Sequence, residues 1–177
     1  MKIIEGKNTY YIIGNIAYLP LSKGKCGILD AIMVPITKHF RWRTHQKSNK
    51  GYYVRTGQRK NQVDMHQLFM QFPLNLEIDH RNRNGMDNRI SNLRLCTHIQ
   101  NCHNSGPRNG KQFKGVRYRP DNKRNPFRAS IHLPNRNLSL GYYPTIEGAA
   151  RAVDRAALKY YGEFAYLNFP EEAYGRY

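Results

Sequence analysis

Residues 77–101 read EIDHRNRNGMDNRISNLRLCTHIQN. The segment begins with an Asp-His pair and continues with a series of asparagines at positions 84, 88, 92 and 101. Few of its side chains are apolar, so it is poorly suited to filling a hydrophobic core. Polar side chains in such a pattern indicate a chemical site, and the alternative is an Asn-rich surface loop followed by a strand and a helix.

The residue types in this segment suit the hydrolysis of a phosphodiester. That reaction needs a base near neutral pH, and histidine has an unperturbed pKa of about 6.5. It also needs a cation beside the departing oxygen, which a bound divalent metal provides. His80 is therefore the candidate general base. Asp79 and Asn101 are candidate metal ligands, since magnesium prefers hard oxygen donors.

The spacing requires a particular local structure. Neighbouring residues of a regular strand point to opposite faces, so Asp79 and His80 serve one site only if the strand ends there. The sequence RNRNGMDN at 81–88, rich in Asn and Gly, predicts such a break. Asn92 is a candidate brace for the wide loop, because an amide side chain can donate and accept at once. Thr97 is a candidate N-cap for a short helix at 98–104 that carries Asn101.

Zinc is the other metal to consider. Four possible ligands lie close together: Cys96, His98, Cys102 and His103. They form no C-x-x-C pair and have no second ligand pair elsewhere, so we expect magnesium, with manganese as the alternative and zinc disfavoured. An odd cysteine count also argues against a disulfide framework and favours a reducing compartment.

The net charge of the chain indicates which class of partner it binds. The chain has 29 Lys and Arg against 12 Asp and Glu, a net charge of +17. Residues 31–63 contain no acid and carry the basic residues Lys38, Arg41, Arg43, Lys47, Lys50, Arg55, Arg59 and Lys60. Double-stranded DNA is the expected partner, contacted here by Arg41 and Arg43; a merely soluble basic face is the alternative.

Nothing in the sequence predicts a membrane-spanning segment or the need for a protein partner. No apolar run approaches 18 residues, and the first residues lack the apolar stretch of a signal peptide. We therefore expect a cytoplasmic protein.

The first part of the chain reads as short strands. The segment TYYIIGNIAYLPL at 9–21 is strand-like. The segment CGILDAIMVPITKHFRW at 26–42 is mixed, and Pro35 restricts any helix through it to its first turn. Residues 52–70 predict a hairpin: YYVRT, a turn at GQRKN, and QVDMHQLFM as the second strand.

The last part predicts a sheet and one helix. FKGVRYR, FRASIHL and NLSLGYY, at 113–119, 127–133 and 137–143, favour an antiparallel meander. TIEGAARAVDRAALKYYG at 145–162 is amphipathic, with Thr145 as N-cap and Gly162 after its end. The preceding SGPRNGKQ at 105–112 has the composition of a linker.

Alternation along the meander predicts one polar face and one apolar face. Val116, Ala129 and Ile131 would face the helix. The opposite face would present the candidate DNA contacts Arg117, Arg119, Arg128, Ser130, His132 and Ser139. An ordinary solvated sheet face is the alternative.

The segment IDHRNRNGMDNRISNLRLCTHIQN resembles the HNH endonuclease motif, in the branch that reads His-Asn-Asn. The resemblance covers roughly residues 61–104 and includes the upstream VDMHQLFM. It implies a ββα-metal fold with His80 as general base, Asp79 and Asn101 as metal ligands, and Asn92 as the structural Asn of the loop. His66 stands where the family often has His-Arg, but Gln67 follows here, so His66 is interpreted as structural or phosphate-contacting.

Residues 113–170 resemble the APETALA/ethylene-response-factor DNA-binding domain, through GVR-R, LG-Y-T-E-AA-A-D-AA and LNFP. The resemblance implies a three-stranded antiparallel sheet on one helix, with the sheet in the major groove. Phe127 and Ser139 replace family tryptophans, and Ser130 replaces an acidic residue. These departures leave the fold expectation intact but change the expected base preference.

Together these patterns predict an α+β protein with four regions: a basic N-terminal region (1–60), a nuclease module (61–106), a linker (107–112) and a DNA-binding domain (113–177). The resemblance is to mobile, homing-type HNH endonucleases of phages and prophages, acting in a bacterial or phage-infected cell. One such site cuts one strand, so we expect nicking. A non-catalytic DNA-binding transcriptional regulator is the main alternative, and a structural RNA-binding protein ranks below it because no stacking signature is evident.

Overall fold

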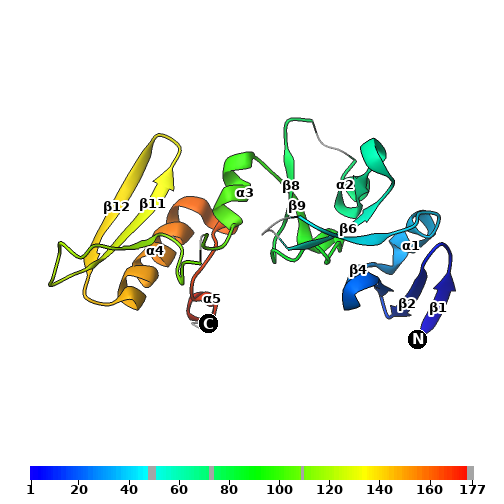
Figure 1. Ribbon diagram of the computed structural model, residues 1–177, viewed down its shortest axis with the longest axis horizontal. Helices are drawn as coiled ribbons and strands as arrows, with labels where there is room; N and C mark the ends of the chain where they lie inside the picture. Colours follow the sequence, from blue (N-terminus) through cyan, green and yellow to red (C-terminus); the bar gives the residue numbers. More distant parts are fainter. Residues whose placement is uncertain (48–50, 72–73, 109, 175–177) are drawn as a thin grey trace. The chain divides into compact units, whose positions relative to one another are not determined.

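The computed structural model describes residues 1–47, 51–71, 74–108 and 110–174. Lys50 of the basic run and Asn109 of the predicted linker lie outside the described residues. Contacts divide the chain into two compact units, Met1–Thr97 and His98–Tyr177. Figure 1 shows the helices and strands of each unit. The division lies between Thr97 and His98, so the helix that carries Asn101 packs within the second unit. The four-region organisation stays a prediction.

The first unit opens with a four-stranded antiparallel sheet in the order β1-β2-β3-β4. Its strands are β1 (Lys2–Glu5), β2 (Thr9–Ile13), β3 (Ile16–Pro20) and β4 (Cys26–Asp30). The strand-like segment 9–21 is thus two paired strands, because Gly14 turns the chain with a φ of 59°. Such a positive φ suits glycine, which has no Cβ to clash.

Short helices and a second sheet follow. Three 3-10 turns are η1 (Ser22–Gly24), η2 (Ala31–Met33) and η4 (Arg59–Asn61). Helix α1 (Val34–Thr37) is one turn long with Pro35 in that turn, as predicted. The strands β5 (Arg43–Gln46), β6 (Tyr52–Thr56) and β7 (Val63–Asp64) form an antiparallel sheet in that order.

The predicted hairpin at 52–70 is only partly correct. β6 pairs with β7, but β7 ends at Asp64 and helix α2 (Met65–Phe69) follows. Asp64 and Gln67 form a capping box, in which the Gln67 side chain accepts from the Asp64 backbone N–H at 3.0 Å. This local cap starts a helix where alternation predicted a strand.

The third sheet of the first unit carries the segment quoted at the outset. β8 (Glu77–His80) pairs antiparallel with β9 (Leu93–Cys96), and a 3-10 turn η5 (Ile90–Asn92) precedes β9. The core of the unit joins residues from the first sheet, β6, α2 and the loop after β8, including Tyr10, Leu29, Val54, Met65 and Met86. The N-terminal residues and the candidate nuclease segment therefore share one core.

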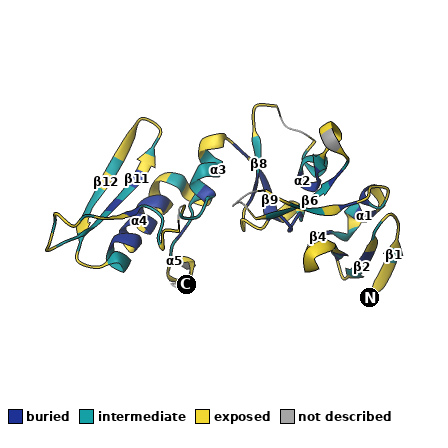
Figure 2. Cartoon of the chain, viewed as in Figure 1, coloured by how far each residue is buried: buried dark blue, intermediate teal, exposed yellow. Residues whose placement is uncertain are grey.

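The second unit contains a three-stranded antiparallel sheet in the order β10-β11-β12. Its elements are α3 (His98–Asn104), β10 (Val116–Tyr118), β11 (Phe127–Leu133), β12 (Arg136–Tyr143), α4 (Ile146–Tyr161), η6 (Gly162–Phe164) and α5 (Pro170–Tyr174). Figure 2 shows buried residues along α4, where its alanines pack on Val116, Ala129 and Ile131. Ala129 lies opposite Gly141 and Ser130 opposite Ser139, so Leu140 is an extra residue on β12, a β-bulge.

Helix α3 is held by the rest of the second unit. Lys114 Nζ donates to the carbonyls of Cys102, His103 and Ser105, at 3.1, 2.6 and 2.7 Å. The His103 ring stacks on Tyr161 with centroids 3.6 Å apart. A cation at the C-terminal end of a helix satisfies carbonyls that have no partner within the helix.

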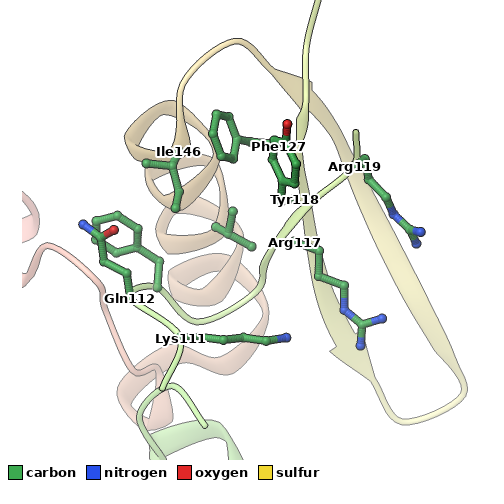
Figure 3. A pocket seen from close by; sticks show the side chains of 9 residues that line it. Lys111, Gln112, Arg117, Tyr118, Arg119, Phe127 and Ile146 are labelled. Carbon is green, nitrogen blue, oxygen red and sulfur yellow. The ribbon is translucent and has the colours of Figure 1, made fainter. Parts of the chain in front are cut away.

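A hollow of about 620 Å³ lies where β10 meets the start of α4 (Figure 3). Phe127 and Ile146 lie toward the helix, whereas Arg117 and Arg119 extend together in another direction. Within the described residues, no helix has the length and apolar character needed to cross a membrane.

Candidate active site

The candidate catalytic pair lies at the end of the β8–β9 hairpin. β8 ends at His80, and both Asp79 and His80 are buried. Asp79 lies directly opposite Arg94 in the ladder, and Arg94 donates from Nε and Nη2 to Asp79 Oδ2 at 2.9 and 2.7 Å. The carboxylate is thus compensated by a buried guanidinium, which sequence reasoning did not identify.

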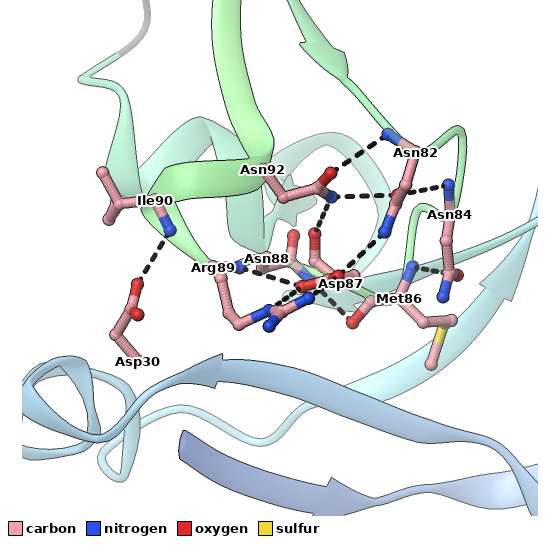
Figure 4. A network of polar contacts seen from close by, with 9 residues as sticks. All are labelled: Asp30, Asn82, Asn84, Met86, Asp87, Asn88, Arg89, Ile90 and Asn92. Atoms are coloured by element: carbon pink, nitrogen blue, oxygen red, sulfur yellow. Dashed lines mark hydrogen bonds and ion pairs between the residues drawn. The ribbon is translucent and has the colours of Figure 1, made fainter. Parts of the chain in front are cut away.

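The wide loop after His80 is closed by asparagine side chains (Figure 4). Asn92 Oδ1 accepts from the Asn82 backbone N–H at 3.0 Å, and Asn92 Nδ2 donates to Asn82 Oδ1 and to the Asp87 carbonyl at 3.0 and 2.8 Å. Asn82 Nδ2 donates to Asp87 Oδ2 at 2.9 Å. Asn92 therefore bonds both sides of the loop, which is the geometry that a brace requires.

The same loop is docked on the first sheet. Ile28 of β4 donates its N–H to the Met86 carbonyl at 2.8 Å, and its carbonyl accepts from the Asn88 N–H at 2.7 Å. Asp30 Oδ2 accepts from the Ile90 N–H at 2.7 Å, as Figure 4 shows. These contacts fix the loop on the first sheet. The sequence analysis assigned no role to the residues that make them, Ile28, Asp30 and Met86.

A close approach of chains explains Gly85 in this loop. A Cβ built on Gly85 would lie 2.6 Å from the Tyr52 carbonyl oxygen and 2.6 Å from the Tyr53 ring. Contacts that short do not occur for real side chains, so the loop lies against β6 only because residue 85 has no side chain.

His80 is enclosed by three side chains. Its Nε2 lies 3.5 Å from Asn88 Oδ1, and its ring packs edge to face with His66 and Tyr53, with centroids 4.9 and 5.8 Å apart. Burial lowers the pKa of His80 from its ordinary value, which keeps the imidazole neutral near pH 7, as a general base requires.

His66 belongs to the same cluster. It lies on α2, is buried, and its Nδ1 has no hydrogen-bond partner among the described residues. Burial first, and then repulsion from His80, lowers the pKa of His66 to about 4. His66 is therefore neutral near pH 7 and supplies a ring contact and not a positive charge.

The Asp79 carboxylate is a donor of the kind that a hard cation takes. Among the described residues, no three or more His, Cys, Asp or Glu side chains form a group that could hold a metal ion. Magnesium needs only one or two carboxylates, because waters and phosphate oxygens complete its shell, and the Asp79 carboxylate fits that demand. Asp79 belongs to the first unit and Asn101, on α3, to the second, so their joint role as ligands stays a prediction.

The candidate DNA contacts of the second unit gather on the sheet face opposite α4. Arg117, Arg128 and Tyr142 lie opposite one another across the three strands, and directly opposed residues share a face. Ser130 pairs with Ser139, and Arg119 follows β10, where its N–H donates to the Pro126 carbonyl at 2.7 Å.

Two residues on this face were not predicted. Tyr142 is 45% exposed beside Arg128, and Asn137 lies opposite His132, whose Nδ1 is 2.8 Å from Asn137 Oδ1. The bulge at Leu140 shifts the alternation along β12, so counting every second residue could not place Tyr142.

The basic candidates of the first unit are exposed. Arg41 precedes β5, and Arg43 lies on β5 opposite Arg55. Arg55 is less suited to contact a DNA phosphate, because its guanidinium donates to both carboxylate oxygens of Asp64 at 2.6 and 2.9 Å. The two exposed arginines remain candidate phosphate contacts.

Comparison with known proteins finds similarity to HNH endonucleases. Residues 71–103 match the family model described as HNH endonuclease. Over 166 residues the chain is 29% identical to an uncharacterized HNH endonuclease of Acanthamoeba polyphaga mimivirus, which covers 90% of this chain and 84% of that protein. No solved structure matches the chain significantly.

A second similarity covers a smaller part of the chain. Over 68 residues the chain is 47% identical to dehydration-responsive element-binding protein 2A of Arabidopsis thaliana. The matched segment is 37% of this chain and 19% of that protein. The family match falls on the β8–β9 hairpin and its loop, where Asp79 and His80 lie. These comparisons relate the chain to the HNH endonucleases.

Proposed function

We propose that this chain is a divalent-metal-dependent DNA endonuclease in which His80 is the general base. The observation that carries the proposal is the buried Asp79–His80 pair at the end of β8, held by an asparagine-bonded loop within the segment that matches HNH endonucleases. A purely structural loop would have no need for a buried, neutral histidine beside a buried carboxylate.

Each residue has a distinct role in this proposal. His80 takes the proton from the attacking water, and Asn92 keeps the loop in shape around it. Asp79 and Asn101 would hold the ion, which we propose is magnesium, with manganese as the alternative. A bound magnesium ion would stabilise the charge that develops on the departing oxygen.

The second unit is proposed to provide DNA recognition. Its sheet presents Arg117, Arg128 and Tyr142 in one row across the strands. Arginine pairs with guanine edges or phosphates, and an exposed tyrosine beside it contributes contact area. The partial similarity to a plant protein named as a dehydration-responsive element-binding protein supports this assignment.

The finer parts of the proposal follow from the resemblance to homing-type HNH enzymes. They are a ββα-metal module formed by β8, β9 and α3, nicking of one strand by one site, and an origin in a mobile element. One general base and one metal suffice to hydrolyse one phosphodiester, so a monomer would nick.

The test is a cleavage assay on supercoiled plasmid with magnesium or with EDTA, comparing the wild type, His80→Ala and His39→Ala. His39 is an exposed histidine and serves as the control. We expect metal-dependent open circles from the wild type and from His39→Ala, and none from His80→Ala. Cleavage that survives in purified His80→Ala would place the base elsewhere.

A non-catalytic DNA-binding regulator is the second candidate, and the 68-residue similarity to a protein named as a dehydration-responsive element-binding protein supports it. The same samples separate the two candidates when they are also run in a gel-shift assay. A regulator would retard DNA and leave phage, host and plasmid DNA uncut at every metal concentration.

A further inference from the structure

The hollow of about 620 Å³ beside β10 lies within the second unit, next to the core that the sheet forms with α4. Buried Val116 lines it, and so do Phe113, Phe127 and Ile146, which are partly buried and pack against the same core. Sites that bind small molecules have volumes of roughly 300–1,000 Å³. The hollow is therefore large enough for a flat apolar group, which would lose its contact with water there.

Tyr118 presents an aromatic ring at this hollow. It lies beside Phe127, its partner across the β10–β11 ladder, with ring centroids 5.7 Å apart (Figure 3). Tyr118 is nevertheless 64% exposed, whereas Val116 of the same strand is 7% exposed. An exposed aromatic ring can stack on planar groups, and nucleic-acid bases are planar.

The rim of the hollow is cationic. Lys111, Arg117 and Arg119 line it, and these three residues are called the rim cations below. All of its lining residues lie in described segments, and none of them is Asp or Glu. A ligand that matches both features combines a planar group with a negative charge close to it. A nucleotide, with its base and its phosphate, is such a ligand.

The position of β10 decides which nucleotides can reach the hollow. β10 is an edge strand of the three-stranded sheet. Val116 faces α4, whereas Arg117, the next residue, belongs to the opposite face, and Figure 3 shows Arg117 and Arg119 extending away from Ile146. A base within a duplex is paired and stacked, so it cannot pass round this edge. An unpaired nucleotide can do so, with its phosphate beside the rim cations.

We propose that the hollow beside β10 binds one unpaired nucleotide of DNA, with its base stacked on Tyr118 and its phosphate held by the rim cations. The inference rests on the proposed function, because it takes the sheet face opposite α4 as the surface that holds the duplex. An enzyme that nicks one strand creates strand ends that can separate from their partner. The second unit would thus favour DNA with a nick, a frayed end or a single-stranded extension over intact duplex.

The test compares the affinity of the full chain for three DNAs in EDTA, so that none is cut. The first is a blunt duplex, the second is the same duplex with a single-stranded extension, and the third has abasic sugars in that extension. Stacking on an aromatic side chain strengthens binding by an amount equivalent to roughly 5–150-fold in affinity. We therefore expect the wild type to bind the second DNA tighter than the other two by a factor in that range.

Variants of Tyr118 assign the difference to the hollow. Tyr118→Ala should lose the preference for the extension and keep the affinity for blunt duplex, whereas Tyr118→Phe should keep both. Tyr160→Ala is the matched control, since Tyr160 is an exposed tyrosine of α4 that does not line the hollow. Thermal unfolding of Tyr118→Ala checks that the variant is folded.

A base analogue whose fluorescence falls on stacking gives a second readout when it is placed in the extension. The wild type should quench it and Tyr118→Ala should not. Equal wild-type affinity for the blunt and extended DNAs would overturn the inference, and so would a preference that survives in Tyr118→Ala. Equal affinity for the extended and abasic DNAs would show that only phosphates are bound. Tighter binding of a ribonucleotide extension would exclude DNA as the preferred occupant.

These outcomes are distinct from failure of the proposed function. A protein that cuts no plasmid but prefers the extended DNA would lose the proposed nuclease activity and keep the nucleotide site. A protein that cuts plasmid and binds the three DNAs equally would keep the activity and lose the site. Binding to none of the three DNAs would overturn the site together with the proposed role of the second unit in DNA recognition.

Discussion

Arg94 and Asp79 face each other across the β8–β9 ladder and form a buried ion pair, with the closest nitrogen–oxygen distance at 2.7 Å. Both side chains are 6% exposed. The pair places a positive charge directly beside the carboxylate proposed to hold the metal. The Arg94 guanidinium compensates the charge of Asp79, and its removal tests both stability and metal binding.

Arg94→Met should destabilise the first unit by about 3–5 kcal/mol, because it leaves Asp79 buried without its partner. Urea unfolding of the purified variant measures this directly. If Asp79 binds a divalent cation, magnesium should raise the stability of Arg94→Met more than that of the wild type, since the ion replaces the lost charge. Equal magnesium effects on the two proteins would argue against Asp79 as a ligand.

His66 should make the stability of the first unit depend on pH. Its folded pKa of about 4 lies below the ordinary value of 6.5, so the unfolded state takes up the proton first as pH falls. Stability is therefore full above about pH 6.5 and declines toward pH 4, by on the order of 3 kcal/mol. Unfolding measured across this range should show a flatter profile for His66→Phe, whereas His39→Phe should behave like the wild type.

Lys114→Met should loosen α3, since three carbonyls near its end lose a charged donor. The expected cost is about 2–3 kcal/mol. Hydrogen exchange should become faster at residues 98–104, which include Asn101. Lys111→Met is the matched control, because Lys111 is an exposed lysine of the same segment. Unchanged protection of α3 in Lys114→Met would show that other contacts suffice.

Arg117→Ala should weaken DNA binding by about 1–3 kcal/mol if Arg117 reads a base, and the loss should depend on sequence. A phosphate contact would instead weaken binding to all sequences alike and reduce its salt dependence. Arg155→Ala is the control, an exposed arginine on α4 and not on the sheet face. Fluorescence titrations at several salt concentrations distinguish these outcomes.

Local signals in the sequence were sufficient for several elements. The helix expected at 145–162 forms at Ile146–Tyr161, with the Thr145 side chain accepting from the Gly148 N–H and Gly162 following the last turn at a φ of 55°. Pro35 lies in the first turn of α1, and the helix expected after Thr97 begins at His98. Periodicity, caps and proline act within a few residues, so they can be read without knowing the fold.

Other expectations failed because a local rule competed with another one. Of the second strand expected at 62–70, only Val63–Asp64 forms, and α2 follows, because the Asp64–Gln67 capping box stabilises a helix start there. Ser139 lies on the polar face of β12 as predicted, but Tyr142 was not placed there, because one extra residue, Leu140, reverses the alternation after it. The capping box can be read in the sequence, whereas the bulge is visible only when the paired residues of β11 are known.

The sequence by itself determined the chemistry that the site can perform: an Asp-His pair, a loop of asparagines, and a basic chain suited to DNA. Only the tertiary structure decided which residues hold that chemistry in place. Asp30 reaches Ile90 across 60 positions, Ile28 bonds both Met86 and Asn88, and Arg94 pairs with Asp79. Such contacts arise when distant segments bury a common core, and no local pattern encodes the partner that each residue meets there.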